Sequence, residues 1–320
     1  MSNPLASLSL DLDNQWSYMK IHGEEGWEEF PSYFDIFVPH VLQVLNDLDL
    51  KITFFIVGQD AASEENRKYI KAIADAGHEI ANHSFKHETW LHLYSKEELR
   101  EEIDSAHNIL KEVTGKDAVG FRGPGYSWSH THLEVLAEKN YVYDASTLPT
   151  IIGPLARWYY FRTSNLSKQE KEDRNEIFGK FSDGFRKLKP YYWKLPSGKK
   201  LLELPVTVMP IFRIPFHMSY LLYLSNISTG LMMVYLHVAI FLCKVTRTRP
   251  SFLLHPLDLI GGDQIKALDF FPGMNISSDR KILIFRKVIA ILGKYFTLTD
   301  MRGHVAQILE RDSKISVAVP

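Results

Sequence analysis

The chain has 320 residues, 45% hydrophobic and 23% charged, which is the composition of a globular protein with a sizeable core. Lys and Arg total 37 against 38 Asp and Glu, so the net charge gives no reason to expect a nucleic-acid partner. One cysteine, Cys243, excludes an internal disulfide framework. The first residues show no basic region followed by a long apolar run, and we therefore expect a cytoplasmic protein.

Short apolar runs alternate with segments of helical periodicity along most of the chain. The predicted strands are 8–13, 52–58, 79–82, 119–122, 141–144, 201–206, 251–256 and 296–299. The predicted helices are 35–48, 64–76, 96–113, 133–139, 281–292 and 301–309. The first strand alternates leucine with polar residues, which indicates a half-buried strand. This order is typical of parallel βαβ units, in which active sites lie at the carboxyl ends of the strands.

Two segments interrupt the alternation. Residues 157–200 contain twelve Lys or Arg, five Asp or Glu and ten aromatic residues. We interpret this segment as an inserted subdomain with a solvated basic face, and an anionic substrate or a membrane surface is the alternative. Residues 214–243 contain no Asp, Glu, Lys or Arg, but the polar residues 225–230 break the apolar run. Two short apolar helices, packed in the core or lying on a membrane, are favoured over a transmembrane span, which needs about 20 apolar residues.

His83 and His87 are the first candidates for metal binding. If their segment is helical, a spacing of four residues puts both imidazoles on one face, where they can bind a single ion. Such a pair alone is more often structural. However, Asp11 and Asp13 end the first strand on the same side and can supply a third ligand. One carboxylate and two imidazoles leave coordination positions open for water and substrate, as in a catalytic site, and hydrolysis is the natural use.

Several motifs occur in a fixed order at the predicted strand ends and resemble one family. They are Asp11-Leu12-Asp13, His83-Ser84-Phe85-Lys86-His87, Arg122-Gly123-Pro124-Gly125-Tyr126 and Leu254-His255-Pro256. Together they resemble the polysaccharide deacetylase (NodB homology, carbohydrate esterase family 4) family over residues 8–145 and 201–258. The resemblance implies an α/β fold, a distorted (β/α) barrel. It also implies metal-dependent hydrolysis of an amide on an amino sugar.

The resemblance also implies roles for single residues. Asp13, His83 and His87 would hold a divalent metal, zinc first, with Co, Mn, Ni or Fe as alternatives. Asp11 would act as the general base and His255 as the general acid.

Arg122 would orient Asp11, and the substrate would contact Pro124, Gly125, Tyr126 and Asp144. A backbone N–H of Gly125 or Tyr126 would stabilise the oxyanion. Asp144 is a candidate for orienting His255, and its simpler interpretation is a turn or helix cap.

Two departures from the commonest family pattern concern Leu12 and Gly125. Leu12 separates the two acids, as in the Asp-x-Asp subgroup, whose substrates are more varied. Alternation along a strand still keeps Asp11 and Asp13 on one side. Gly125 stands where a tyrosine is usual, and this affects the substrate contacts rather than the metal site.

We therefore expect a single catalytic domain over residues 1–320. It would carry a basic and aromatic cap at 150–200 and an apolar helical insertion at 211–247. The expected function is removal of an N-acetyl or N-formyl group from an amino sugar of a polysaccharide or lipid-linked glycan. The alternatives are a small-amide hydrolase of the same fold and a non-catalytic glycan-binding protein. A further hypothesis is that residues 157–200 and 214–243 form a membrane-facing cap for a lipid-linked sugar. The oligomeric state is not indicated.

Overall fold

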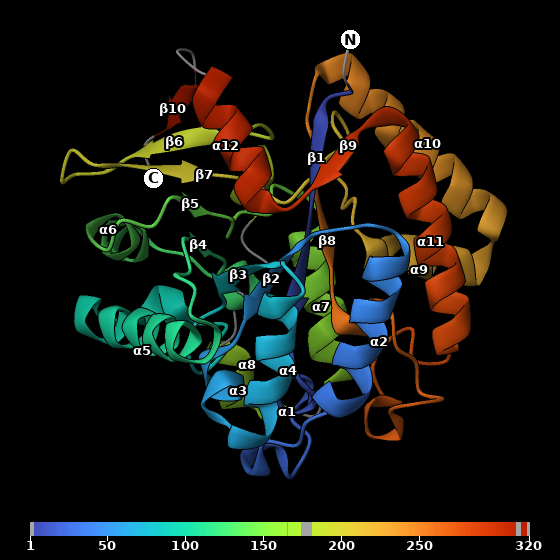
Figure 1. Ribbon diagram of the computed structural model, residues 1–320, viewed down its shortest axis with the longest axis horizontal. Helices are drawn as coiled ribbons and strands as arrows, with labels where there is room; N and C mark the ends of the chain where they lie inside the picture. Colours follow the sequence, from blue (N-terminus) through green and yellow to red (C-terminus); the bar gives the residue numbers. More distant parts are fainter. Residues whose placement is uncertain (1–2, 165, 174–180, 312–314, 319–320) are drawn as a thin grey trace.

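A ten-stranded sheet forms the centre of the computed structural model, which describes residues 3–164, 166–173, 181–311 and 315–318 (Figure 1). The strands are β1 (Leu5–Leu12), β2 (Thr53–Ile56), β3 (Glu79–Asn82), β4 (Gly120–Phe121), β5 (Tyr143–Asp144), β6 (Tyr191–Lys194), β7 (Lys200–Glu203), β8 (Ser251–Leu254), β9 (Thr297–Thr299) and β10 (Ser316–Ala318). Their order is β10-β6-β7-β5-β4-β3-β2-β1-β8, with β9 paired to β1. Each of these pairings is parallel except the antiparallel pair β6–β7.

This topology confirms the predicted α/β fold with a mostly parallel sheet. Among the described strands no pairing joins β8 to β10, so hydrogen bonds do not close the sheet into a ring. The carboxyl ends of β1, β3, β4 and β8 lie at one edge, because these strands belong to the parallel part of the sheet. We call it the carboxyl edge. Each motif identified from the sequence begins in or directly after one of these strands.

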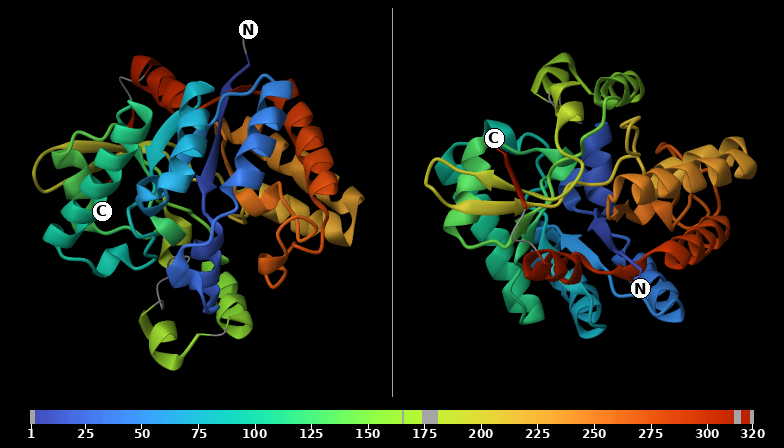
Figure 2. Two further views of the ribbon diagram at one scale, coloured as in Figure 1. Left: turned by 60° about the horizontal axis from the view of Figure 1, so that its bottom comes forward. Right: turned by 90° about the horizontal axis from the view of Figure 1, so that it is seen from above.

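Helices surround the sheet (Figure 2, right). They are α1 (Gln15–His22), α2 (Phe34–Asp47), α3 (Gly58–Ala62), α4 (Glu64–Asp75), α5 (Lys96–Thr114), α6 (His130–Glu138), α7 (Gly153–Thr163), α8 (Lys168–Asp173), α9 (Met218–Ile227), α10 (Thr229–Thr246), α11 (Ser278–Tyr295) and α12 (Met301–Arg311). Every helix predicted from periodicity is present. The helix α1 was missed because it is short and its start depends on one side chain, Asn14, which accepts a hydrogen bond from the Gln15 N–H.

Strand β1 is buried on both sides, and the prediction of a half-buried strand is therefore wrong. Leu8, Leu10 and Leu12 are fully buried, but Ser9 and Asp11 on the other side are buried as well. The polar side is covered because it faces other parts of the chain that hydrogen-bond to it, including the guanidinium of Arg122. Its polarity marks an interior functional site rather than contact with solvent.

The basic and aromatic segment 150–200 contributes to two parts of the structure. Helices α7 and α8 project from the body of the molecule (Figure 2, left), whereas β6 pairs with β7 and belongs to the sheet. Residues 165 and 174–180 of the segment lie outside the described residues. The division of the chain into one domain with a cap and an apolar insertion stays a prediction.

The apolar segment forms two helices, α9 and α10, which lie beside α11 (Figure 1). Within the described residues, α10 is the one helix whose length and composition would also suit a membrane span, a test that core helices of soluble proteins pass as well. Its residues Met232, Leu236, Ala239 and Cys243 are buried in the main hydrophobic core together with α11. Helix α10 is therefore integrated into the fold along one of its sides.

Candidate active site

Asp13, His83 and His87 form a buried cluster at the carboxyl edge of the sheet. One ligand atom of each residue lies within 4.8 Å of the others. Nε2 of His87 is 2.9 Å from Oδ1 of Asp13, and Nε2 of His83 is 3.5 Å from the same oxygen. Among the residues that the structure describes, this is the one group of three His, Cys, Asp or Glu side chains close enough to hold a metal ion.

The cluster fits a divalent metal ion. Oδ1 of Asp13 is buried without a hydrogen-bond partner, although two imidazole nitrogens face it. A buried carboxylate oxygen in this situation is satisfied by a cation. Nδ1 of His83 lies 2.6 Å from the backbone carbonyl oxygen of Arg122, to which it donates as the protonated nitrogen. This bond orients the ring and leaves Nε2 as the ligand atom.

The charge state of Asp13 also suits a metal ligand. Burial by itself would raise the pKa of this carboxyl group, but the charges of His87 and His83 and their contacts lower the pKa below its usual value. The carboxylate is therefore ionised at neutral pH, as metal binding requires.

The segment between the two histidines is a loop, and the prediction that a helical turn brings them together is wrong. Ser84 and His87 have positive φ angles of 63° and 55°, which a right-handed helix excludes. Side chains hold this loop, since Asn82 accepts a hydrogen bond from the Ser84 N–H and Glu102 accepts one from the Phe85 N–H. The loop also lies against Gly58, where an added Cβ would be 2.5 Å from the Phe85 ring.

Asp11 and Arg122 form a buried ion pair next to the cluster. Nη1 of Arg122 lies 2.5 Å from Oδ1 of Asp11 and also donates to Oγ of Ser9 at 3.0 Å. Nε of Arg122 donates to the backbone carbonyl of Ala145, and the guanidinium lies 4.1 Å from the centre of the Phe55 ring. Nη2 of Arg122 also contacts Sδ of Met301 at 3.6 Å. Arg122 is thus fixed by five partners, and it holds Asp11 in one orientation with its charge compensated.

His255 follows β8 and has Asp258, not Asp144, as its nearest carboxylate partner. Nδ1 of His255 lies 3.8 Å from Oδ2 of Asp258 and 3.3 Å from Oγ of Ser219 in α9. Oδ2 of Asp258 also accepts a hydrogen bond from the backbone N–H of His255. Burial by itself would lower the pKa of His255, but Asp258, with the charges of Asp11 and Asp13, raises it to about 9.

Asp258 is a site residue that the sequence motifs do not include. Its position three residues after His255, within the 3₁₀ turn that begins at Pro256, could have indicated a contact with this histidine. His217, directly before α9, is also outside the sequence motifs. Its ring lies 6.1 Å from that of His255, and burial, with the charge of His255, lowers its pKa to about 4. Helix α9 therefore forms one wall of the site.

Asp144 is linked to the arginine motif through hydrogen bonds of Ser146. Oδ1 of Asp144 accepts a hydrogen bond from Oγ of Ser146, and this hydroxyl accepts the N–H of Gly123. Asp144 therefore does not orient His255, contrary to the prediction. It ends β5, and β4, β3, β2 and β1 lie between β5 and β8 in the sheet.

Pro124, Gly125 and Tyr126 form a short 3₁₀ turn after β4. Tyr126 donates its backbone N–H to the carbonyl oxygen of Gly123 at 3.0 Å, which leaves the Gly125 N–H as the candidate oxyanion donor. The phenol of Tyr126 is buried, and burial with the nearby charge of Asp11 raises its pKa. Tyr126 is therefore a neutral hydrogen-bond donor beside Asp11.

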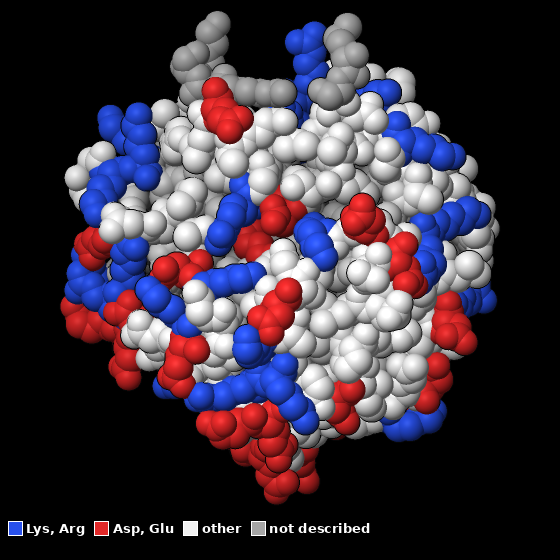
Figure 3. Space-filling model, in the orientation of Figure 1, with Lys and Arg blue, Asp and Glu red and all other residues white. Residues whose placement is uncertain are grey.

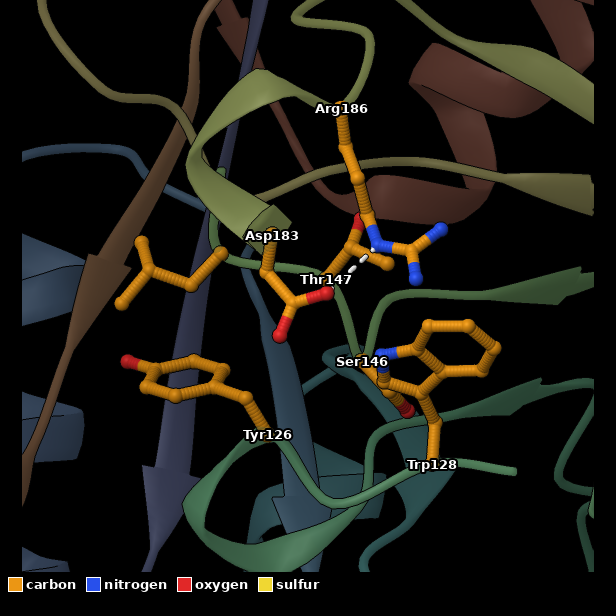
Figure 4. Close-up of a pocket in the computed structure, with 7 residues that line it drawn as sticks. Tyr126, Trp128, Ser146, Thr147, Asp183 and Arg186 are labelled. Carbon is orange, nitrogen blue, oxygen red and sulfur yellow. Dashed lines mark hydrogen bonds and ion pairs between the residues drawn. The ribbon is translucent and has the colours of Figure 1, made fainter. Parts of the chain in front are cut away.

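A shallow pocket opens beside Tyr126 (Figure 4). The rings of Tyr126 and Trp128 lie on one side, and Asp183 and Arg186 lie on the other. Nε of Arg186 is 2.9 Å from Oδ1 of Asp183, and its guanidinium is 4.2 Å from the centre of the Trp128 ring. The segment 150–200 thus contributes side chains to a pocket next to the arginine motif.

Comparison with known proteins supports the sequence resemblance. Residues 27–143 match the family described as polysaccharide deacetylase. The peptidoglycan deacetylase of Helicobacter pylori is 25% identical over 168 residues, which cover 50% of this chain and 54% of that protein. The peptidoglycan deacetylase-like protein FGM2 of Gibberella zeae is 33% identical over 125 residues, which cover 38% of this chain and 35% of that protein. The chain thus spans about half or less of the length of these curated relatives.

The fold comparison extends over the whole chain. The crystal structure of a proposed polysaccharide deacetylase from Mycobacterium smegmatis superposes with a TM-score of 0.57 and 18% identity, and covers 100% of this chain and 99% of that chain. At this identity the likeness establishes the fold alone.

Proposed function

We propose that this chain, whose residues 27–143 match the polysaccharide deacetylase family, is a metal-dependent hydrolase that removes an N-acetyl or N-formyl group from an amino sugar. The observation that supports the proposal best is the adjacency of three units. These are the Asp13, His83 and His87 cluster, the Asp11–Arg122 pair and the His255–Asp258 pair. The charges of Asp11 and Asp13 lie close enough to His255 to raise its pKa.

The metal ligands in this proposal are Asp13, His83 and His87, and zinc is the first choice of ion because the ligand set contains two imidazoles and one carboxylate. When bound, a divalent ion supplies Lewis acidity, which polarises the acyl carbonyl and makes water a stronger acid. Co, Mn, Ni and Fe remain alternatives, because imidazole and carboxylate ligands bind each of them.

Asp11 acts as the general base. Its carboxylate accepts a proton from the water that attacks the acyl carbon, and the ion pair with Arg122 orients it. The Gly125 N–H stabilises the negative charge that develops on the acyl oxygen. Each of these groups is held by the fold before substrate binds, so little reorganisation is needed during the reaction.

His255 acts as the general acid. A pKa of about 9 means that its imidazole carries a proton at neutral pH. Amide hydrolysis releases an amine, which is a poor leaving group as an anion and needs a proton from the protein. Asp258 compensates the imidazolium charge, and Ser219 contacts Nδ1. This leaves Nε2 to deliver the proton to the substrate.

The substrate class follows from the names of the relatives and stays part of the proposal. Two of them are described as peptidoglycan deacetylase or peptidoglycan deacetylase-like, so amino sugars of peptidoglycan or of a lipid-linked glycan are the first substrates to test. We also propose a cytoplasmic location with peripheral contact to membranes.

Release of acetate or formate by the purified full chain tests the proposal. N-acetylated and N-formylated amino sugar oligomers are incubated with chain that has been depleted of metal and then reloaded with zinc, cobalt or manganese. We expect product only after reloading. Asp11→Asn should retain metal but lose turnover, because it removes the base and leaves the ligands intact. A glycan-binding protein would bind the oligomers tightly and yield no product with any ion, and this result would overturn the proposal.

A further inference from the structure

One side of α10 exposes apolar side chains along its whole length. The exposed fractions are 45% for Leu231, 62% for Val234, 39% for Val238, 63% for Phe241 and 62% for Val245. The spacing alternates between three and four residues, so these five side chains form one stripe on the helix. We call this stripe the α10 apolar face. Helix α9 adds Tyr223 and Ile227, which are 66% and 63% exposed.

The rest of α10 holds the helix in place. Met232, Leu236, Ala239 and Cys243 are buried in the main core on another side of the helix. A membrane span through α10 would expose these four side chains and break their contacts with α9 and α11. The exposed stripe is therefore available for contact with an external surface that lies parallel to the helix axis.

In the sequence around α10, every charged residue is basic. Residues 204–257 contain no Asp or Glu, but they contain Arg213, Lys244, Arg247 and Arg249. Lys244 and Arg247 are exposed at the C-terminal end of α10, directly beside Val245. In Figure 3, Lys and Arg side chains lie along the upper right edge of the molecule, where Figure 1 places α10.

We propose that the α10 apolar face docks the protein onto an anionic lipid surface. The stripe is one helix wide, consists of Leu, Val and Phe, and ends in exposed cations within a sequence segment, residues 204–257, that contains no Asp or Glu. This is the chemistry of an interfacial helix. The apolar side chains enter the boundary between headgroups and acyl chains. Lys244 and Arg247 contact the anionic headgroups.

The docking face is connected to the proposed site through α9. Ser219, near the start of α9, contacts His255, and Ile227 at the end of the same helix is exposed next to α10. Docking would therefore place one wall of the site near the lipid surface. The docking proposal does not depend on hydrolysis, because neither the α10 apolar face nor its cations contact the metal cluster.

Vesicle flotation of the full chain tests the docking. The probes are vesicles of phosphatidylcholine alone and of phosphatidylcholine mixed with phosphatidylglycerol, each at low and high salt. We expect flotation with the mixed vesicles, weaker at high salt because exposed charges are screened. The double substitution Val234→Glu with Phe241→Glu should reduce the bound fraction about fivefold or more, since it puts two charges into the apolar boundary. Activity on a soluble substrate should be unchanged.

The matched control is Leu309→Glu, which charges a 47% exposed leucine on α12, away from α10 (Figure 1). It should float like the unmodified chain. Three results would overturn the proposal: no flotation of the unmodified chain at low salt, an equal loss of flotation with Leu309→Glu, or a dimer in sedimentation that Phe241→Glu converts to a monomer without any flotation. The last result would assign the α10 apolar face to contact between copies. Melting curves verify that each variant is folded.

Discussion

The carboxyl edge of the sheet and the α10 apolar face differ in which side chains they bury. At the carboxyl edge, Asp11, Asp13 and Arg122 are buried, and each faces an oppositely charged or imidazole group of the same chain. On α10, by contrast, Val234 and Phe241 are exposed, and no described residue covers them. Burying a charge is costly unless a partner is present, and a continuous exposed apolar stripe is an indicator of contact with something outside the chain.

The contrast separates two kinds of functional surface. The charged site is preorganised by contacts within the chain, so its variants should change metal content, turnover and stability together. The apolar face depends on an external partner, so its variants should leave folding and chemistry nearly unchanged. The predictions below test this difference, from the largest expected effect to the smallest.

Removal of a metal ligand should have the largest effect. Asp13→Asn or His83→Ala should lower metal content and reduce turnover by about 10³-fold or more, because Lewis acidity contributes several kcal/mol to such hydrolysis. Metal analysis of the purified protein and acetate release measure the two effects. His237→Ala, at an exposed histidine of α10, is the control and should keep both. Full metal content and turnover in His83→Ala would refute the ligand assignment.

Breaking the buried ion pair should reduce stability strongly. Arg122→Met leaves Asp11 charged and unpaired, and we expect a loss of about 3–5 kcal/mol in the free energy of unfolding. Urea denaturation at neutral pH measures it. Arg100→Met removes a surface partner of Glu138 and should cost less than about 1 kcal/mol. Similar losses of stability in the two variants would show that breaking the buried Asp11–Arg122 pair costs no more than breaking a surface ion pair.

The proton on His255 should give the site a high-pH limit. Its pKa is raised from 6.5 to about 9, so the protonated acid predominates below this value and is lost as pH rises through it. Turnover should therefore decline above pH 9. Asp258→Asn removes the main group that raises this pKa and should move the decline downward by about one pH unit or more. Asp263→Asn is the control, because Asp263 contacts Ser278 instead. An unshifted profile in Asp258→Asn would exclude the positioning role of Asp258.

Substitutions on the two sides of α10 should differ in their effect on stability. Leu236→Ala, at a fully buried position, should cost about 2–5 kcal/mol because it leaves a cavity. Phe241→Glu, at a 63% exposed position, should change stability by less than about 0.5 kcal/mol. Denaturation in the absence of lipid measures both. A large loss in Phe241→Glu would show that its side chain is part of the fold rather than a contact surface.

Sequence by itself determined most of the strands and helices and the set of motifs. Apolar periodicity is a local property, so the strands near residues 53, 79 and 251 and the helices α2, α4, α5 and α11 could be predicted from their own residues. Spacing also indicated which side chains end neighbouring strands, so that Asp11 or Asp13 could join His83 and His87, and the family resemblance selected Asp13.

Tertiary structure alone decided which carboxylate faces His255. The contact between Arg122 and Asp11, expected from the family resemblance, forms because β4 and β1 belong to one sheet. Asp258 rather than Asp144 faces His255, because Asp258 lies in the turn that directly follows β8 and His255. Val234 and Phe241 are exposed because α10 packs against the core with its other side. The sequence of α10 is almost uniformly apolar, so it does not indicate which side of the helix is buried. Local patterns specify elements, but burial and pairing depend on contacts between residues far apart in the chain.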